Sequence, residues 1–320
     1  MTARSCRRPS SPAAAFTLVE LLITVSIVAI MATMMLFALN SAQETAKTVK
    51  TKALIAKIDA IIRDKWEAYR TRRVPIAIPS GTPVKLATQM RLDGLRELMR
   101  LELPDCWTDV TDAPITLANP PSAGTIARPS VSVRYLANYM ARLPSAEYQG
   151  AECLYMIVMN SPSDDDVRET FHASDFGDID NDGFPEFVDA WNHPLRFIRW
   201  PVGFVSNFQP LDANGNRNPV DNHDPFDSSS VYTNAYATYP LIYSAGPNGV
   251  FGIQSSPTVD SSGNTIYPSR NGNNNDPFAP YAPNPTANPP VGTTKDFPME
   301  PNFVTSGWLD NIHNHMNLTR

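Results

Sequence analysis

A run of acidic residues in the middle of the chain has the spacing of a cation-binding loop. In the segment DIDNDGFPEFVD (178–189), carboxylates stand at the first, third and fifth positions, and acids return at the ninth and twelfth. Calcium prefers six to eight oxygen ligands in a loop that can wrap around it, and a glycine at the sixth position allows the sharp turn. We therefore expect a calcium site whose ligands are Asp178, Asp180, Asp182, Glu186, Asp189 and the backbone carbonyl of Phe184.

This segment resembles the calcium loops of EF-hand and dockerin proteins. The twelfth position holds Asp189, as in dockerin loops, rather than the Glu of EF-hands. Pro185 also disfavours the helix that follows the loop in an EF-hand. The resemblance thus implies the loop but not the EF-hand fold. The competing interpretation is a solvated acidic turn, because Asp and Asn are common turn residues.

Other patterns that would indicate an enzyme are missing from the sequence. No G-x-S-x-G, H-E-x-x-H or P-loop motif occurs. Asp164 and Asp166 follow a proline and are read as a solvated loop rather than as a hydrolase carboxylate pair. The five histidines lack zinc-ligand spacing, and His313 with His315 is predicted to be a polar tail. We predict that the protein is not an enzyme.

A second chemically informative residue is Glu20, which lies inside an apolar stretch. Residues 21–39 carry no charge, and with Phe16–Val19 the span is long enough to cross ~30 Å of hydrocarbon as a helix. A cleaved signal peptide or a plain anchor would fit this pattern, with the preceding arginines placing the N-terminus in the cytoplasm. Neither gives a reason for an acid, which costs ~2–3 kcal/mol or more inside lipid and so indicates a function.

The residues AFTLVELL (15–22) resemble the processing motif of type IV pilins and type II secretion pseudopilins. The resemblance implies that a prepilin peptidase cuts after Ala15, that the new amine of Phe16 is methylated, and that Glu20 meets the N-terminal amine of a neighbouring subunit. In a low-dielectric helix bundle, either charge would be strongly unfavourable without the other. Their pairing would therefore set the register between neighbouring helices. Ala15 departs from the usual glycine, which implies slower cleavage.

Two later segments resemble major pseudopilins of type II secretion. DAWNHP (189–194) shares its Asp, Trp and Pro with their D-x-W-G-x-P segment. SAGPNG (244–249) is similar to their S-x-G-x-D-G loop, with Asn248 in place of Asp. The pseudopilins hold calcium in that later loop. Because Asn replaces its acid here, a calcium ion could occupy either this loop or 178–189.

The elements that must position these residues follow from hydrophobic periodicity. Apolar side chains recur at three- and four-residue steps from Val49 to Tyr69, which predicts an amphipathic helical stem over 41–73, ended by Pro75. In the head we expect helices at 86–103 and 131–143, a helix or buried strand at 151–160, strands within 195–205 and 239–245, and a long irregular loop over about 255–300.

Charge and cysteine content narrow the class of protein. Residues 74–320 carry a net charge of −13, which argues against nucleic acid as a partner. Cys106 and Cys153 could form a disulfide if the head lies outside the cytoplasm, but we favour two buried free thiols.

These observations together predict an α+β, pilin-like protein. The expected parts are a leader (1–15), a transmembrane helix (16–40), a stem (41–73) and an extracytoplasmic head (74–320) with a small antiparallel sheet.

The predicted function is a structural subunit of a type II secretion pseudopilus or related type IV pilus-like filament, with calcium stabilising the head. It would sit in the bacterial inner membrane as a single-pass protein with its head periplasmic or extracellular. Its partners would be the prepilin peptidase, other copies or other pseudopilins, the inner-membrane assembly machinery and lipid. The alternatives are a minor pilin or adhesin that binds an external ligand, and an anchored calcium-binding protein that never polymerises.

Overall fold

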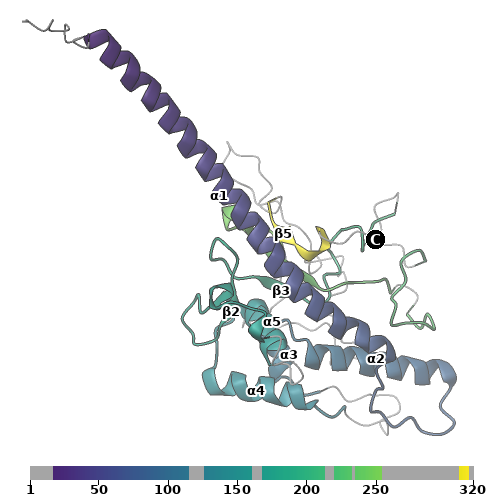
Figure 1. Cartoon of the computed structure of the whole chain (residues 1–320). Coiled ribbons are helices and arrows are strands. Elements are labelled where there is room, and N and C mark those ends of the chain that lie inside the picture. The colour runs from purple at the N-terminus through teal and green to yellow at the C-terminus, as the bar shows by residue number, and fades with distance from the viewer. Residues whose placement is uncertain are drawn as a thin grey trace, which may run out of the picture. The chain divides into compact units, whose positions relative to one another are not determined.

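The chain forms one long N-terminal helix followed by a head of helices and small antiparallel sheets, an α+β layout like that of pilins (Figure 1). The computed structural model describes residues 17–114, 126–160, 168–212, 220–232, 235–253 and 310–316. The predicted leader with Ala15 and Phe16, the pair Asp164 and Asp166, and the loop predicted over 255–300 all lie outside these residues. The chain divides into two compact units, Met1–Ala46 and Lys47–Arg320.

The first unit is the apolar part of helix α1 (Leu18–Ala68). Every described side chain up to Ala46 is exposed, although the segment is dominated by Leu, Ile, Val, Met and Ala. Its hydroxyl groups donate within the helix, for example from Thr24 Oγ1 to the Leu21 carbonyl at 2.9 Å and from Ser26 Oγ to the Leu22 carbonyl at 2.8 Å. Among the described residues this is the one helix long and apolar enough to cross a membrane. It is consistent with a single-pass anchor, because all its polar groups can be satisfied internally.

The second half of α1 belongs to the head and packs one face into its core. The buried residues Leu54, Ile55, Ile58, Ile62 and Trp66 confirm the predicted three- and four-residue spacing. Val49, which the periodicity also placed on this face, is instead 60 % exposed. The α-helix ends at Ala68 and continues as a 3-10 turn, η1 (Tyr69–Thr71), slightly before the predicted end at 73.

The described part of the head contains four more α-helices. α2 (Val84–Glu102) and α4 (Ser130–Arg142) confirm the two amphipathic predictions within two residues, and α5 (Gln149–Met159) shows that the apolar run near 151–160 is a helix rather than a strand. α3 (Trp107–Thr111) was not predicted. α5 is buried on most sides and contacts α3, β2 and β3, so it lies at the centre of the head.

Two small antiparallel sheets complete the described head. β1 (Phe176–Gly177) pairs with β2 (Glu186–Phe187), and β3 (Arg196–Ile198) pairs with β4 (Leu241–Ser244), which pairs with β5 (Ile312–His313). β3 and β4 confirm the predicted strands but are shorter. The prediction of a polar tail at His313 and His315 is wrong: His313 is in β5, and His315, in η6 (Asn314–Met316), is buried against Phe204 and hydrogen-bonded to Ser206.

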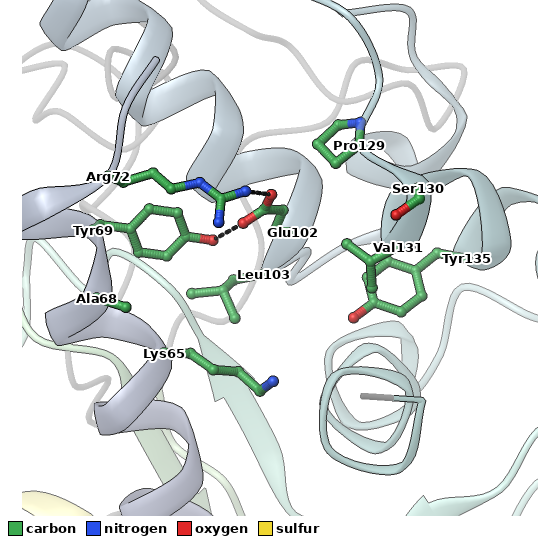
Figure 2. Close-up of a pocket in the computed structure, with 10 residues that line it drawn as sticks. All are labelled: Lys65, Ala68, Tyr69, Arg72, Glu102, Leu103, Pro129, Ser130, Val131 and Tyr135. Atoms are coloured by element: carbon green, nitrogen blue, oxygen red, sulfur yellow. Dashed lines mark hydrogen bonds and ion pairs between the residues drawn. The ribbon is translucent and has the colours of Figure 1, made fainter. Parts of the chain in front are cut away.

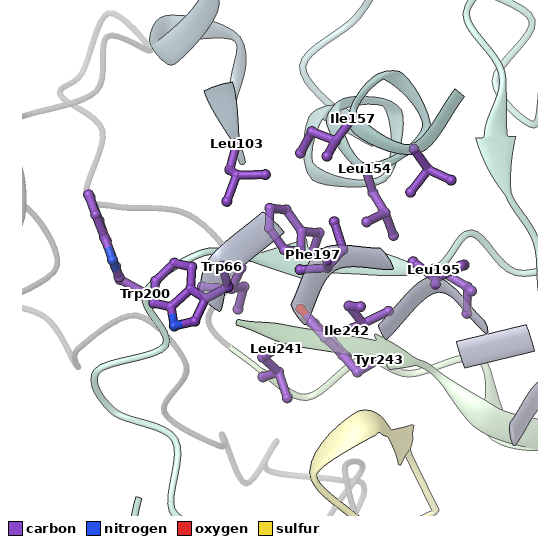
Figure 3. Packing of buried hydrophobic residues seen from close by; sticks show 14 of the residues in the cluster. Trp66, Leu103, Leu154, Ile157, Leu195, Phe197, Trp200, Leu241, Ile242 and Tyr243 are labelled. Atoms are coloured by element: carbon purple, nitrogen blue, oxygen red, sulfur yellow. The ribbon is translucent and has the colours of Figure 1, made fainter. Parts of the chain in front are cut away.

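The main hydrophobic core joins α1, α2, α5 and the three-stranded sheet. Figure 3 shows Trp66 from α1, Leu154 and Ile157 from α5, and Phe197 and Ile242 from the sheet converging on one another. All five are at most 2 % exposed. The stem portion of α1 is therefore part of the folded head, because its removal would open this core.

A conservative truncation at Ile58 tests this packing. Ile58 is fully buried, so Ile58→Val is expected to lower the free energy of unfolding by about 0.5–1.5 kcal/mol, whereas exposed Val49→Ala should change it by less than about 0.5 kcal/mol. The measurement is denaturant unfolding of the full chain in detergent, followed by tryptophan fluorescence. All five Trp residues lie at position 66 or beyond, so the signal reports on the head. Equal effects of the two substitutions would show that α1 is not packed there.

Candidate functional site

Residues 178–185 of the predicted calcium loop lie between β1 and β2, whereas Glu186 is in β2 and Asp189 follows it. Its backbone takes the left-handed conformation twice, at Asn181 (φ 61°) and Gly183 (φ 90°). Asn tolerates this region and Gly adopts it freely. The two reversals bring the carboxylate oxygens of Asp178, Asp180 and Asp182 within 4.8 Å of one another.

Backbone and hydroxyl donors orient these three carboxylates. Gly183 N donates to Asp178 Oδ2 at 3.0 Å, and Phe184 N donates to Asp182 Oδ1 at 2.8 Å. Ser145, in the turn before α5, donates from its hydroxyl to Asp180 Oδ2 and from its amide to Asp182 Oδ2, both at 2.6 Å. The loop is therefore tied to the segment that leads into α5.

The sequence did not indicate that a fourth acid, Glu152, faces this loop. Glu152 lies on α5 and is 0 % exposed, as is Glu186 at the start of β2. One carboxylate oxygen from each of Glu152, Glu186 and Asp180 lies within 4.8 Å of the other two. The only signal available was an acid in the apolar run AECLYMIVM, which is unusual for a buried helix.

Burial and mutual repulsion make these acids hard to ionise together. Burial, together with the neighbouring acids Asp182, Glu186 and Asp180, raises the pKa of Glu152 to about 9. Burial likewise raises the pKa of Glu186 to about 7, despite the hydrogen bond that Ile179 N donates to its Oε2 at 3.0 Å. Such a concentration of carboxylates needs either protons or a cation.

The remaining predicted ligands are placed differently. Asp189 is buried and accepts hydrogen bonds from Ser244 Oγ at 2.6 Å, Trp191 N at 2.8 Å and His193 N at 2.9 Å. It connects the end of the acidic segment to β4 and is in neither group of close acids among the described residues. Phe184 packs its ring against Trp107, with centroids 5.2 Å apart, beneath the loop.

The later loop that resembles the pseudopilin calcium loop is closed by hydrogen bonds. Asn248 Nδ2 donates to Asp310 Oδ1 at 2.7 Å, and Asn248 N donates to Asp310 Oδ2 at 3.3 Å. Gly246 (φ 70°) approaches the Asp310 backbone so closely that an added Cβ would lie 2.5 Å from its carbonyl oxygen. The Asn248 side-chain amide therefore satisfies the Asp310 carboxylate by hydrogen bonding. An Asp at position 248 would instead place two carboxylates side by side and require a cation.

A further buried acidic group, comprising Asp105, Cys106 and Asp109, is neutralised by arginine. Arg199 Nη1 donates to Asp109 Oδ2 at 2.7 Å, and Arg100 binds Glu97 through two hydrogen bonds of 2.9 and 2.7 Å. Cys106 and Cys153 are both buried free thiols, as favoured from the sequence, and burial raises the pKa of each. In this group the arginine side chains already neutralise the carboxylates.

A cavity of about 480 Å³ opens between α1, α2 and α4 (Figure 2). Glu102 accepts hydrogen bonds across it from Tyr69 Oη at 2.8 Å and from Arg72 Nη2 at 2.7 Å. Burial and Glu102 raise the pKa of Tyr69 well above its ordinary value, so its phenol remains a donor. The described residues that line the cavity include no His or Cys, and they do not form a nucleophile–base pair.

At the N-terminal site, Thr17 and Glu20 form a capping box at the start of α1. Thr17 N and Thr17 Oγ1 both donate to Glu20 Oε2 at 2.9 Å, and Glu20 N donates to Thr17 Oγ1 at 3.2 Å. This reciprocal arrangement satisfies orphan backbone donors of the first turn. The T-x-x-E spacing alone could have predicted this capping box, but these residues were interpreted only as part of the processing motif.

Comparison with known proteins supports the N-terminal motif. Residues 11–36 match the family model described as the prokaryotic N-terminal methylation motif. No curated protein and no solved structure matches the chain. The motif is typical of type IV pilin-like proteins, which are prepilin peptidase substrates and structural subunits rather than enzymes.

Proposed function

We propose that the protein is a structural subunit of a type II secretion pseudopilus or a related type IV pilus-like filament. The observation that carries this proposal is the methylation motif at residues 11–36, which coincides with the start of a long helix that is apolar at its beginning and exposed through Ala46. An exposed apolar surface of this length requires lipid or neighbouring helices to cover it. A filament core of such helices would supply that cover after the subunit leaves the membrane.

In this proposal the precursor lies in the bacterial inner membrane with its N-terminus in the cytoplasm and its head outside. The prepilin peptidase cuts between Ala15 and Phe16 and methylates the new amine, and the assembly machinery then adds the subunit to other copies or to other pseudopilins. Glu20 would exchange its hydrogen bonds with Thr17 for the Phe16 amine of a neighbour. The predicted leader, transmembrane, stem and head regions follow the same plan.

Intact-mass spectrometry of the protein extracted from membranes tests the processing step. The expected N-terminus is Phe16 carrying one methyl group. Ala15→Gly should be processed at least as completely as the wild type, whereas Ala15→Leu should leave the precursor uncut, because the usual residue before the cut is the smallest one. A chain that retains Met1 in cells with an active peptidase would refute the proposal.

A further inference from the structure

Three neighbouring acids of α5 and the β1–β2 hairpin carry four buried carboxylate oxygens that lack protein donors. They are both oxygens of Glu152, Oδ1 of Asp180 and Oε1 of Glu186, and none accepts a hydrogen bond from the described residues. No described Lys, Arg or His forms an ion pair with these three acids. A buried carboxylate without a donor or a counter-ion is strongly unfavourable.

The other oxygens of the group are already satisfied. Asp180 Oδ2 accepts from Ser145 Oγ, and Glu186 Oε2 accepts from Ile179 N. These bonds hold the two carboxylates, and each keeps one buried oxygen without a donor in a group of acids whose ligand atoms lie within 4.8 Å of one another. Asp180 and Glu186 are therefore oriented as ligands, each held by an outer donor and each with one free oxygen, and Glu152 adds two more free oxygens.

The arginine-balanced group elsewhere in the head provides an internal comparison. Asp109 is as deeply buried as Glu152, but Arg199 donates to it at 2.7 Å. Elsewhere the head thus satisfies its buried carboxylates, with a guanidinium at Asp109 and with hydroxyl and backbone donors at Asp189. The ionisable groups that act most strongly on Glu152 are acids, namely Asp182, Glu186 and Asp180.

We propose that Glu152, Asp180 and Glu186 bind one calcium ion that joins α5 to the β1–β2 loop, with the carboxylates of Asp178 and Asp182 adjoining the site. This site differs from the loop expected from sequence, because its central ligand comes from a helix that precedes the loop and Asp189 takes no part. The proposal does not depend on polymerisation.

The separations and ligand types favour calcium. Oxygens bound to one calcium at 2.3–2.6 Å can be at most about 5 Å apart, and the three acids satisfy this limit at 4.8 Å. All the free ligand atoms are carboxylate oxygens, which suit a hard cation and not zinc. Four free oxygens, two of them on one carboxylate, also fit the bidentate, irregular coordination of calcium better than the octahedron of magnesium.

The alternative is that shared protons hold the cluster together. Glu152 and Asp182 are close enough for one proton to bridge their carboxyl groups. The two possibilities differ in their response to a single substitution. Glu152→Gln removes the ionisable carboxyl group with little change in shape, so it should leave the calcium-free head as stable as the wild type or more stable, but it should abolish stabilisation by calcium.

Trp107 provides a built-in reporter of this site. Its indole Nε1 donates to the Ser145 carbonyl at 2.9 Å, and its ring contacts Phe184. Full-length protein in detergent, stripped with EDTA, can therefore be titrated with calcium while tryptophan fluorescence and heat are measured. We expect one calcium per chain and a rise in melting temperature of about 5–10 °C at a calcium concentration a hundredfold above Kd.

The variants decide between the possible locations. Glu152→Gln should weaken calcium binding at least about tenfold and remove the thermal shift, whereas Glu169→Gln, which changes an exposed acid of the head, should behave as the wild type. A wild type without a calcium-dependent shift would overturn the site. So would undiminished binding by Glu152→Gln, particularly if Asp178→Asn abolishes it, because the ion would then lie in the exposed loop alone. An equal shift with magnesium would overturn the assignment to calcium.

Discussion

Replacing Asp109 by alanine is expected to lower the free energy of unfolding of the head by about 3–5 kcal/mol. Asp109 and Arg199 are both 0 % exposed, and their side chains are joined at 2.7 Å. Asp109 also accepts from Asp105 N at 3.3 Å and lies 3.5 Å from Arg100 Nη1. The substitution would leave a buried guanidinium and a buried backbone amide without their common acceptor, and both penalties exceed that of a lost surface contact.

The ionic state of Asp109 sets the pH range in which this loss should be seen. Burial alone would raise its pKa, but the guanidinium groups of Arg199 and Arg100 hold the pKa below 3.8, its ordinary value. A depressed carboxyl pKa contributes stability that is present above the unfolded pKa and is lost as pH falls through the folded one. The difference between wild type and Asp109→Ala should therefore be complete at pH 7 and shrink below about pH 4.

Denaturant unfolding of the full chain in detergent, followed by tryptophan fluorescence, provides the measurement. Glu67→Ala is the matched control, because it breaks an ion pair of the same 2.7 Å length with Arg70 whose side chains are 44 % and 48 % exposed. That exposed pair should contribute at most about 1 kcal/mol. The double variant Asp109→Leu with Arg199→Met should recover part of the stability. Losses of similar size for Asp109→Ala and Glu67→Ala would contradict the network's role.

The parts of this fold that could be predicted are those with local signals. α1, α2 and α4 each have a stripe of apolar residues at three- and four-residue spacing, and each helix is present. α5 is buried on most sides, so its apolar run has no clear period, and helix could not be separated from strand. β1, β2 and β5 are only two residues long, too short for alternation to be read.

The candidate site was predictable only in its continuous part. The spacing of Asp178, Asp180 and Asp182 is a property of one short loop and identified it. Glu152 is separated from that loop along the chain, and its role depends on α5 packing against β2, which no local pattern encodes. The same limit applies to Asp109 and Arg199, whose contact joins α3 to the segment after β3.

Substitutions at Glu20 should separate its charge from its role in capping α1. Gln can occupy the third helical position of a capping box, so Glu20→Gln keeps the possible hydrogen bonds with Thr17 but removes the charge. If Glu20 pairs with a neighbour's Phe16 amine in the filament core, this variant leaves that amine buried and uncompensated. A penalty of about 3–5 kcal/mol per subunit would weaken assembly by at least about a hundredfold.

Thr17→Ala is the complementary variant. It removes the hydroxyl cap at a cost of about 0.5–2 kcal/mol to the helix start but leaves the carboxylate. We expect wild-type incorporation into filaments for Thr17→Ala and almost none for Glu20→Gln, measured by the labelled subunit recovered in sheared filaments relative to its membrane pool. Both variants should be cleaved before Phe16, so that processing and assembly are scored separately. Filament incorporation of Glu20→Gln at the wild-type level would mean that Glu20 serves only to begin α1, because the hydrogen bonds to Thr17 would then account for its presence in an otherwise apolar segment.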